Sequence, residues 1–570
     1  MSKNRIEHSF AKGVLIITIG MFFVKVFGAL FKIPLVHILG GEGNGYFLAA
    51  YNLYNPIYAL ASAGLPIAIS RMIAEAVKEK RFRDVKKIHK LSIPIFFVMA
   101  IFGFVLMIFC AFVSAKISKM PGALYSMLML APTLLFSCLI SIYKGYYQGL
   151  KNMIPTAITE VIEAAGKVVF GIGFAYFVLK YLSNEYEKFG TIFGKYCENE
   201  VFARGLIIQY SASAAVFGIC TAALAGLIGI FFIHKFNGEV ITAEEIKNSP
   251  KEKNTKEIIN NILKISVPVG LGAIILNLAG YVDSVLISMR LSDIMDICPE
   301  TLLRVYPRLI PSDTIARGTT HAFLTGCFAI MSYIVMMVPT ISQGLAISAL
   351  PSVTTAWVGG ISREIKKSIE TVLKTTAIVA FPSGIGLAVL SQPIVNLVYN
   401  SFSNSCETGK IFIASKIMII AAIAIIFVTI CTPVCSMLQA VGRADLPVKI
   451  LSLGVLAKVI LNYILVGIPE INIQGASIGT LVCYFFICVV SILCLQKEAK
   501  VKINFFNTII KPLFCAVCCG IFAYLFYEFF SRTIGPKVGT IGAIGFAGII
   551  YLILILMTKT AKIRLIRLPS

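Results

Sequence analysis

Charged residues are scarce in this sequence of 570 residues. Asp, Glu, Lys and Arg make up 14% of it, whereas soluble domains carry about 25%. Histidine occurs only five times and tryptophan once, while hydrophobic residues make up 58% of the chain. No soluble core can bury so many apolar side chains, so the composition excludes both a soluble enzyme and a disordered chain.

Long apolar runs account for most of the sequence. A helix that crosses a bilayer needs about 20 mainly apolar residues. The first run is too long for the core of a signal peptide, so we expect it to remain as a membrane anchor. The sequence therefore predicts an all-α integral membrane protein with about 14 transmembrane helices. The fourteen runs are residues 12–38, 45–70, 92–115, 122–149, 156–182, 206–234, 264–290, 319–350, 371–399, 410–440, 446–468, 473–495, 508–530 and 536–558.

The few charges are mostly positive. There are 51 Lys and Arg residues against 28 Asp and Glu residues, which gives a net charge of +23. Fourteen spans place both termini and every second loop on one side, and the basic clusters fall on that side, at residues 78–90, 363–367, 497–502 and 559–567. Because cytoplasmic loops are rich in Lys and Arg, we expect both termini in the cytoplasm, on a bacterial plasma membrane. Most of the positive charge is then a topology signal, and no nucleic-acid partner is expected.

One short basic segment occurs twice. Residues 83–87 read Arg-Asp-Val-Lys-Lys and residues 363–367 read Arg-Glu-Ile-Lys-Lys, an offset of 280. Matches at fixed offsets fall in spans 2–5 and 8–11, which indicates a repeat of six helices and two parallel lobes. We predict an N-terminal lobe at 1–236, a cytoplasmic linker at 237–263, a C-terminal lobe at 264–497, and two further helices with a basic tail at 498–570.

Ionisable residues inside the predicted spans are the strongest candidates for function, because a charge within a bilayer is costly and usually faces an interior cavity. Most of them are cations: Lys25 and Lys32 in the first span, Lys144 in the fourth, and Arg290 at the end of the seventh. A cavity lined by these side chains would attract an anion, in particular a phosphate or pyrophosphate. The alternative for Lys25 and Arg290 is that their side chains extend to the membrane interface.

Two charge pairs are predicted within the spans. Glu163 and Lys167 have the i,i+4 spacing of an ion pair on one helix. Asp283 of the seventh span needs a partner, and Lys458 shares a helical face with Asn462 in the second lobe. We predict that Lys458 neutralises Asp283 and so fills a position where a transported cation would otherwise bind.

Three segments of the sequence carry a family resemblance. They read VKVFGALFKIPL at 24–35, LPIAISRMIAE at 65–75 and IYKGYYQGLKNMIPTAITEVIE at 142–163. They resemble the polysaccharide-biosynthesis and stage V sporulation protein B branch of the multidrug/oligosaccharidyl-lipid/polysaccharide (MOP) exporter superfamily, and the resemblance covers essentially the whole chain. That branch is similar to the MurJ lipid II flippases. The resemblance implies a V-shaped carrier with a central cavity, a lipid-tail groove at helices 13 and 14, and an undecaprenyl-pyrophosphate-linked substrate.

The resemblance also implies roles for individual basic residues. In the flippases, basic residues on the first, second and eighth helices bind the pyrophosphate. Lys25 matches the first of these, Lys32 matches the second with a slip of one residue, and Arg71 is the counterpart on the second span. The eighth span has no internal Lys or Arg, so Arg290 of the seventh span would take that part.

A sodium site is implied only partly. Some flippases bind sodium through an acid on helix 7 and polar groups on helices 11 and 12, and Asp283, Asn462 and Thr480 resemble that set. Lys458, one turn before Asn462, departs from the pattern. We expect no cofactor and no bound metal, and leave coupling to an ion or to the membrane potential open.

The leading hypothesis is a non-enzymatic flippase. It would move lipid II or a lipid-linked oligosaccharide to the outer leaflet as a monomer surrounded by membrane lipids, with the headgroup bound by Lys25, Lys32, Arg71 and Lys144. A MATE-like multidrug or cation antiporter is the alternative, and it predicts an acidic cavity. A membrane glycan polymerase or ligase is a further alternative, and it predicts a large outer loop rich in basic and His residues, which the sequence lacks.

Overall fold

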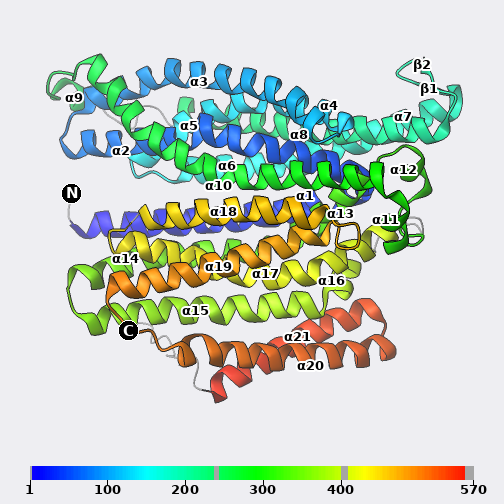
Figure 1. Cartoon of the computed structure of the whole chain (residues 1–570). Helices are drawn as coiled ribbons and strands as arrows, with labels where there is room; N and C mark the ends of the chain where they lie inside the picture. The colour runs from blue at the N-terminus through cyan, green and yellow to red at the C-terminus, as the bar shows by residue number, and fades with distance from the viewer. Residues whose placement is uncertain (1–2, 237–242, 400–407, 444, 559–570) are drawn as a thin grey trace. The chain divides into compact units, whose positions relative to one another are not determined.

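The computed structural model describes residues 3–236, 243–399, 408–443 and 445–558, and almost all of them are helical (Figure 1). Among these residues, twelve helical segments are long and apolar enough to cross a membrane. The predicted all-α membrane fold is therefore confirmed. The helices are α1 (Lys3–Tyr58), α2 (Gly64–Lys78), α3 (Phe82–Ile117), α4 (Leu124–Leu130), α5 (Thr133–Gly149), α6 (Ile154–Gly166), α7 (Ile172–Phe189), α8 (Glu200–Phe236), α9 (Ala243–Lys247), α10 (Thr255–Ile297), α11 (Pro299–Val305), α12 (Ser312–Ala316), α13 (Thr320–Val335), α14 (Met337–Val358), α15 (Ser362–Val389), α16 (Ser391–Tyr399), α17 (Thr408–Ala440), α18 (Asp445–Val466), α19 (Gln474–Ala499), α20 (Lys511–Thr533) and α21 (Pro536–Met557).

The fourteen predicted runs and the twelve segments differ at two places in the chain. The runs 12–38 and 45–70 lie on two helices that are joined at a kink at Gly40 (φ 62°, ψ −164°) and are counted as one segment. The second helix folds back on the first, because the ring centroids of Phe31 and Phe47 lie only 6.0 Å apart. Glycine has no Cβ and adopts positive φ at low cost, so the chain can kink there. The run 264–290 lies within α10, several of whose side chains lie outside the described residues, so the twelve segments do not test this run. The other eleven runs each coincide with one segment.

The chain forms two compact units. Unit 1 comprises Met1–Met289 and Ser312–Gly326, and unit 2 comprises Arg290–Pro311 and Cys327–Ser570. These units group residues by packing, and they place most of α10 with the first unit. The predicted lobes group residues by their place in a repeat, so their boundaries at 236 and 264 remain a prediction.

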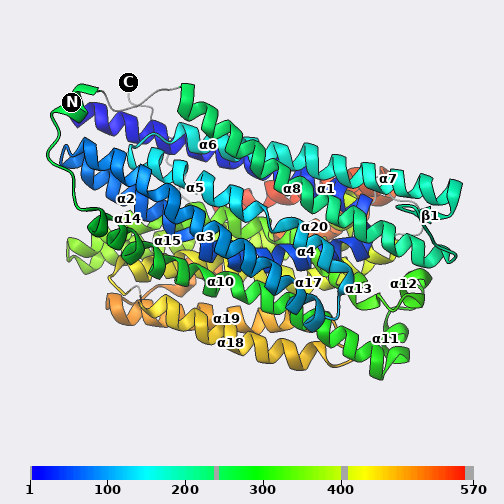
Figure 2. The same cartoon turned by 90° about the horizontal axis from the view of Figure 1, so that it is seen from above.

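The helices of unit 1 run side by side between two ends (Figures 1 and 2). We call one the α2–α3 end, because it holds the turn between those helices together with α9. We call the other the α12 end, and it also holds a short antiparallel hairpin of β1 (Thr191–Ile192) and β2 (Lys195–Tyr196). The sequence did not predict this hairpin. The apolar core of the unit is built mainly from α1, α4 and α8, with Leu35, Leu39 and Met127 among its buried side chains.

Unit 2 packs α15, α17 and α19 around a second core, which includes Phe381, Met437 and Leu495. α20 and α21, the two helices predicted beyond the repeat, pack on each other, and α20 also packs on α15. The Tyr551 hydroxyl donates to the carbonyl oxygen of Ile378 at 2.8 Å, which attaches α21 to α15. These two helices are therefore an integral part of unit 2.

The two copies of the repeated basic segment occupy similar places in the two units. Residues 83–87 begin α3 and residues 363–367 begin α15. Asp84 Oδ1 accepts a hydrogen bond from the backbone N of Lys253 at 2.8 Å, two residues before α10. Glu370 Oε1 accepts one from the backbone N of Asn504 at 2.9 Å, two residues before the π-helical turn Phe506–Ile510 that leads into α20. In each unit, therefore, a carboxylate on the helix that bears the repeated segment accepts a hydrogen bond from a backbone N. That backbone N lies just before a later helix.

Candidate anion site in unit 1

An intramembrane ion-pair network joins α5 to α6. Lys144 of α5 places its Nζ 3.3 Å from Glu163 Oε1 and 3.6 Å from Glu160 Oε1, both on α6. The Lys144 and Glu163 side chains are 18% and 19% exposed. Burying one of these charges alone would be costly, and the mutual pairing compensates that cost. The two helices are thus linked by charges that are largely shielded from solvent.

Lys167 extends this network. It begins the π-helical turn Lys167–Gly171, directly after α6, and its ammonium interacts electrostatically with Glu163 and with Tyr51 of α1. The predicted pair of Glu163 and Lys167 is therefore part of a larger arrangement, in which the ion pair of Glu163 is made to Lys144. That Glu163 and Lys167 form an ion pair with each other remains a prediction.

The first helix contributes two more cations. Lys32 of α1 is half-buried, and it lies close enough to Lys25 and Lys167 for their charges to repel its own. Lys25 is exposed. We call the six residues Lys25, Lys32, Lys144, Glu160, Glu163 and Lys167 the Lys144 network.

The Lys144 network is cationic overall. Four lysines face two glutamates, so the network carries two positive charges more than its own carboxylates can neutralise. In a medium of low dielectric constant such an excess is a strong attractor for an anion. The arrangement suits a group with two or more negative charges, such as a diphosphate.

Tyrosines line α1 beside these charges, and sequence reasoning missed them. Tyr51, Tyr54 and Tyr58 follow one another along one face of the helix, with ring centroids 6.1 Å and 5.4 Å apart. The Tyr54 hydroxyl lies 3.4 Å from Ser137 Oγ of α5. Their spacing of three and four residues was the signal in the sequence that could have revealed them, because it places side chains on one helical face. These hydroxyls add neutral hydrogen-bonding groups to the same region.

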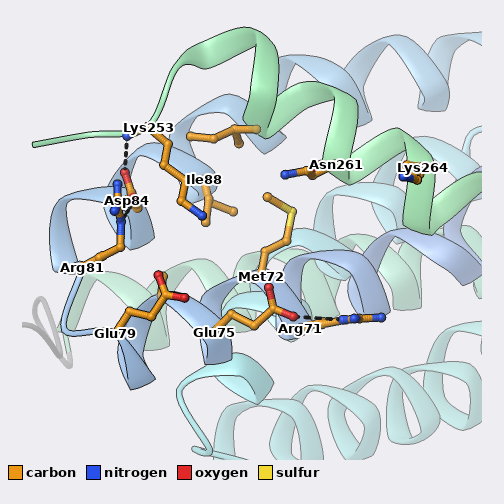
Figure 3. Close-up of a pocket in the computed structure, with 12 residues that line it drawn as sticks. Arg71, Met72, Glu75, Glu79, Arg81, Asp84, Ile88, Lys253, Asn261 and Lys264 are labelled. Atoms are coloured by element: carbon orange, nitrogen blue, oxygen red, sulfur yellow. Dashed lines mark hydrogen bonds and ion pairs between the residues drawn. The ribbon is translucent and has the colours of Figure 1, made fainter.

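Arg71 lies elsewhere in unit 1. Its guanidinium is exposed on α2, and its Nε bonds Glu75 Oε1 at 3.1 Å. It lines a cleft of about 560 Å³ at the α2–α3 end, and no residue of the Lys144 network lines that cleft (Figure 3). The structure therefore brings Lys25, Lys32 and Lys144 together and places Arg71 at a separate site.

Arg290 belongs to unit 2. Its Nη1 bonds Asp293 Oδ2 at 2.8 Å, its Nε donates to the carbonyl oxygen of Tyr463 at 3.2 Å, and its guanidinium lies 4.6 Å from the centre of the Tyr463 ring. The two contacts with Tyr463 attach the end of α10 to α18, whereas Asp293 lies on α10 itself. Its predicted part in binding pyrophosphate remains a prediction.

The residues of the predicted second-lobe site are divided between the units. Asp283 lies in unit 1, whereas Lys458 and Asn462 lie in unit 2, so the pairing of Asp283 with Lys458 stays a prediction. Asn462 is fully buried where α18 meets α19. A Cβ at Gly479 would lie 2.1 Å from Asn462 Oδ1, so a larger residue there would displace the Asn462 amide. Thr480 follows directly and donates to the Ala476 carbonyl oxygen at 2.8 Å.

The twelve apolar helical segments and the fold define the class: a multi-pass membrane protein with the fold of MOP-superfamily transporters. A solved MATE family multidrug transporter of that superfamily, in an inward-facing conformation, matches with a TM-score of 0.61 at 13% identity. The match covers 86% of this chain and 99% of the other. The lipid II flippase MurJ in its inward closed conformation also matches with a TM-score of 0.61, at 16% identity, over 96% and 99% of the two chains.

Sequence comparison adds the particular relatives. Residues 10–185 match the family model described as polysaccharide biosynthesis protein. The lipid II flippase MurJ of Bacillus subtilis (strain 168) is 20% identical over 500 residues, which cover 86% of this chain and 82% of the relative. Stage V sporulation protein B of the same organism is 23% identical over 475 residues, 83% and 81% of the two chains. The resemblance stated from the sequence is confirmed: the protein is a homologue of MurJ and of stage V sporulation protein B.

Proposed function

We propose that this protein is a flippase that moves an undecaprenyl-pyrophosphate-linked cell-wall precursor, lipid II or a lipid-linked oligosaccharide, from the cytoplasmic to the outer leaflet. The observation that carries the proposal is the positive excess of the Lys144 network within the helices of unit 1. Homology to a protein named lipid II flippase supports the same class of cargo. The action is transport without chemical change of the cargo.

The sign of the charge favours this cargo over a cation. A MATE-like antiporter for drugs or cations requires a binding region with an excess of carboxylates, because opposite charge stabilises the bound ion. The Lys144 network has the opposite balance, with two glutamates against four lysines. A diphosphate would compete with Glu160 and Glu163 for the ammonium of Lys144, and the glutamates would hold that ammonium in place until the cargo arrives.

Orientation follows from the basic end of unit 1. The turn and first helical turns at the α2–α3 end contain Lys80, Arg81, Arg83, Lys86 and Lys87. By the rule that cytoplasmic loops concentrate Lys and Arg, this end faces the cytoplasm and the α12 end faces outward. The precursor headgroup, which is made in the cytoplasm, would reach the Lys144 network from the α2–α3 end.

Complementation of a strain depleted of its lipid II flippase tests the proposal. We expect the wild-type protein to restore growth and Lys25→Ala to lose that rescue, because the variant removes a cation that acts on Lys32 and on the bound anion. Lys180→Ala serves as the matched control, since Lys180 is an exposed lysine of α7 outside the network.

Three outcomes decide the matter. Rescue that survives Lys25→Ala contradicts a role of Lys25 in binding the cargo. Failure of the wild-type protein to rescue, with normal amounts in the membrane, contradicts lipid II and favours a capsule or spore polysaccharide as the glycan. Loss of rescue in Lys180→Ala would show that the assay responds to any lost cation.

A further inference from the structure

A cleft at the α2–α3 end of unit 1 is separate from the Lys144 network. One wall is α2, the second is the start of α3, and the third is the first turns of α10 with the residues before it (Figure 3). Its volume of about 560 Å³ lies within the usual range for small-molecule sites. Met72, Ile88 and Ile258 supply an apolar surface between the charged lining residues.

The walls of the cleft are fixed to one another by hydrogen bonds. Asp84 is buried, and its carboxylate accepts from Arg81 Nε at 2.5 Å and from the backbone N of Lys253 at 2.8 Å. Lys87 Nζ donates to the carbonyl oxygen of Lys253 at 2.9 Å and lies 3.3 Å from Glu252 Oε2. The segment before α10 is therefore held on α3, so the cleft is preformed.

The charges of the cleft are unequally satisfied. Arg71 is paired with Glu75, and Arg81 with Asp84. Glu79, Lys253 and Lys264 also line the cleft, so four cations face three carboxylates there, and within the part of the chain that the structure describes no ion pair joins either lysine to a carboxylate. Asn261 lies between them along the chain and lines the same space, as Figure 3 shows. Lysine is a common phosphate ligand, and charge-assisted hydrogen bonds to phosphate oxygens are strong.

The position of Lys264 favours a phosphate carried by a lipid. Lys264 stands at the start of the apolar run 264–290, and its neighbour Leu263 is an exposed apolar side chain. Ile67, one helical turn from Arg71 on the same face of α2, is exposed as well. Cations beside exposed apolar side chains at the end of a membrane helix lie where lipid headgroups lie.

We propose that this cleft binds the phosphate of an anionic membrane lipid, with Lys264, Lys253 and Asn261 as its donors and the acyl chains along the apolar surface near Leu263 and Ile67. The bound lipid would connect α2 to α10. The proposal is independent of the transported cargo, since the lipid stays in its leaflet and the Lys144 network takes no part.

Binding of phosphatidylglycerol to the purified full-length chain, measured by native mass spectrometry and by thermal unfolding in detergent, tests the proposal. We expect Lys253→Gln/Lys264→Gln to weaken binding by at least about tenfold, because two charge-assisted hydrogen bonds are lost. Lys251→Gln/Lys256→Gln is the matched control: it removes the same charge from exposed lysines of the same segment that do not line the cleft. Lys264→Arg should retain binding, because it keeps the cation.

Phosphatidylcholine and inorganic phosphate are the comparison ligands. We expect both to bind at least about tenfold more weakly than phosphatidylglycerol, since one lacks net charge and the other lacks acyl chains. Equal weakening by the control double variant would overturn the site, and so would equal binding of phosphatidylcholine. Inorganic phosphate that binds as tightly as the lipid would overturn the assignment to a lipid. If the double variant unfolds without added lipid, the affinities of Lys264→Gln and Lys264→Arg for phosphatidylglycerol are compared instead, and their ratio decides the same question.

Discussion

Lys144→Met is expected to abolish transport while leaving a folded protein in the membrane. Methionine keeps the length and apolar stem of the side chain, so packing between α5 and α6 is conserved, and only the ammonium is lost. Glu160 and Glu163 then lack their direct cation, and the local charge changes from two positive to one positive. Growth complementation measures transport, and size-exclusion chromatography of a fluorescent fusion measures folding.

A second variant separates binding of the cargo from simple charge balance. Lys144→Met/Glu163→Gln restores the net charge of the network without restoring the ammonium. If Lys144 only neutralises Glu163, this double variant should recover transport. We expect it to remain inactive, because an anion needs the ammonium itself. Lys151→Met is the control, since Lys151 is an exposed lysine in the turn after α5. Full activity of Lys144→Met would remove the network from the proposed mechanism.

Most of the helical architecture could be predicted from the sequence, because a bilayer imposes a length and a polarity on every spanning helix. The length and composition of each apolar run in the sequence show this length and this polarity directly. They do not report how two successive runs are joined, and so the kink at Gly40 between the helices of the first two runs was not predicted. The β1–β2 hairpin was missed for a similar reason, since two residues per strand leave no periodic pattern.

The site was predicted less completely than the fold. Lys32, Lys144 and Glu163 could be singled out from the sequence, because the cost of a charge within a membrane depends only on the residue type and on its place in a span. Which charges meet depends on tertiary contacts. Helical spacing suggested Lys167 as the partner of Glu163, and that pair stays a prediction. The ion pair of Glu163 with Lys144, which is 19 residues earlier and on another helix, was not predicted. The resemblance grouped Arg71 with Lys25, and this role of Arg71, which lines the cleft at the α2–α3 end, stays a prediction.

One buried ion pair gave no local signal at all. Glu42 lies between the first two predicted runs, and Arg317 lies just before the eighth, 275 residues later. At the α12 end of unit 1 their side chains are 2% and 8% exposed and lie 2.5 Å apart. Glu42 also accepts from the Tyr46 hydroxyl at 2.7 Å, and Arg317 donates to the carbonyl oxygen of Val201 at 2.8 Å. The pair therefore joins α1, α8 and the segment between α12 and α13.

Glu42→Ala is expected to destabilise the protein by about 3–5 kcal/mol, because it leaves the Arg317 guanidinium buried without a counter-charge. Thermal unfolding of the detergent-purified protein measures the effect. Glu528→Ala is the control: it breaks the exposed pair with Arg532 on α20, and exposed pairs contribute about 0–1 kcal/mol.

Removing both charges distinguishes the ion pair from ordinary packing. Glu42→Ala/Arg317→Met leaves no buried charge, and replacement of a buried pair by apolar groups is often close to neutral. We therefore expect this double variant to recover most of the stability lost in Glu42→Ala. If it unfolds as early as the single variant, the loss comes from the side-chain volume of Glu42 and not from its charge. If Glu42→Ala is no less stable than Glu528→Ala, the pair does not hold the α12 end together.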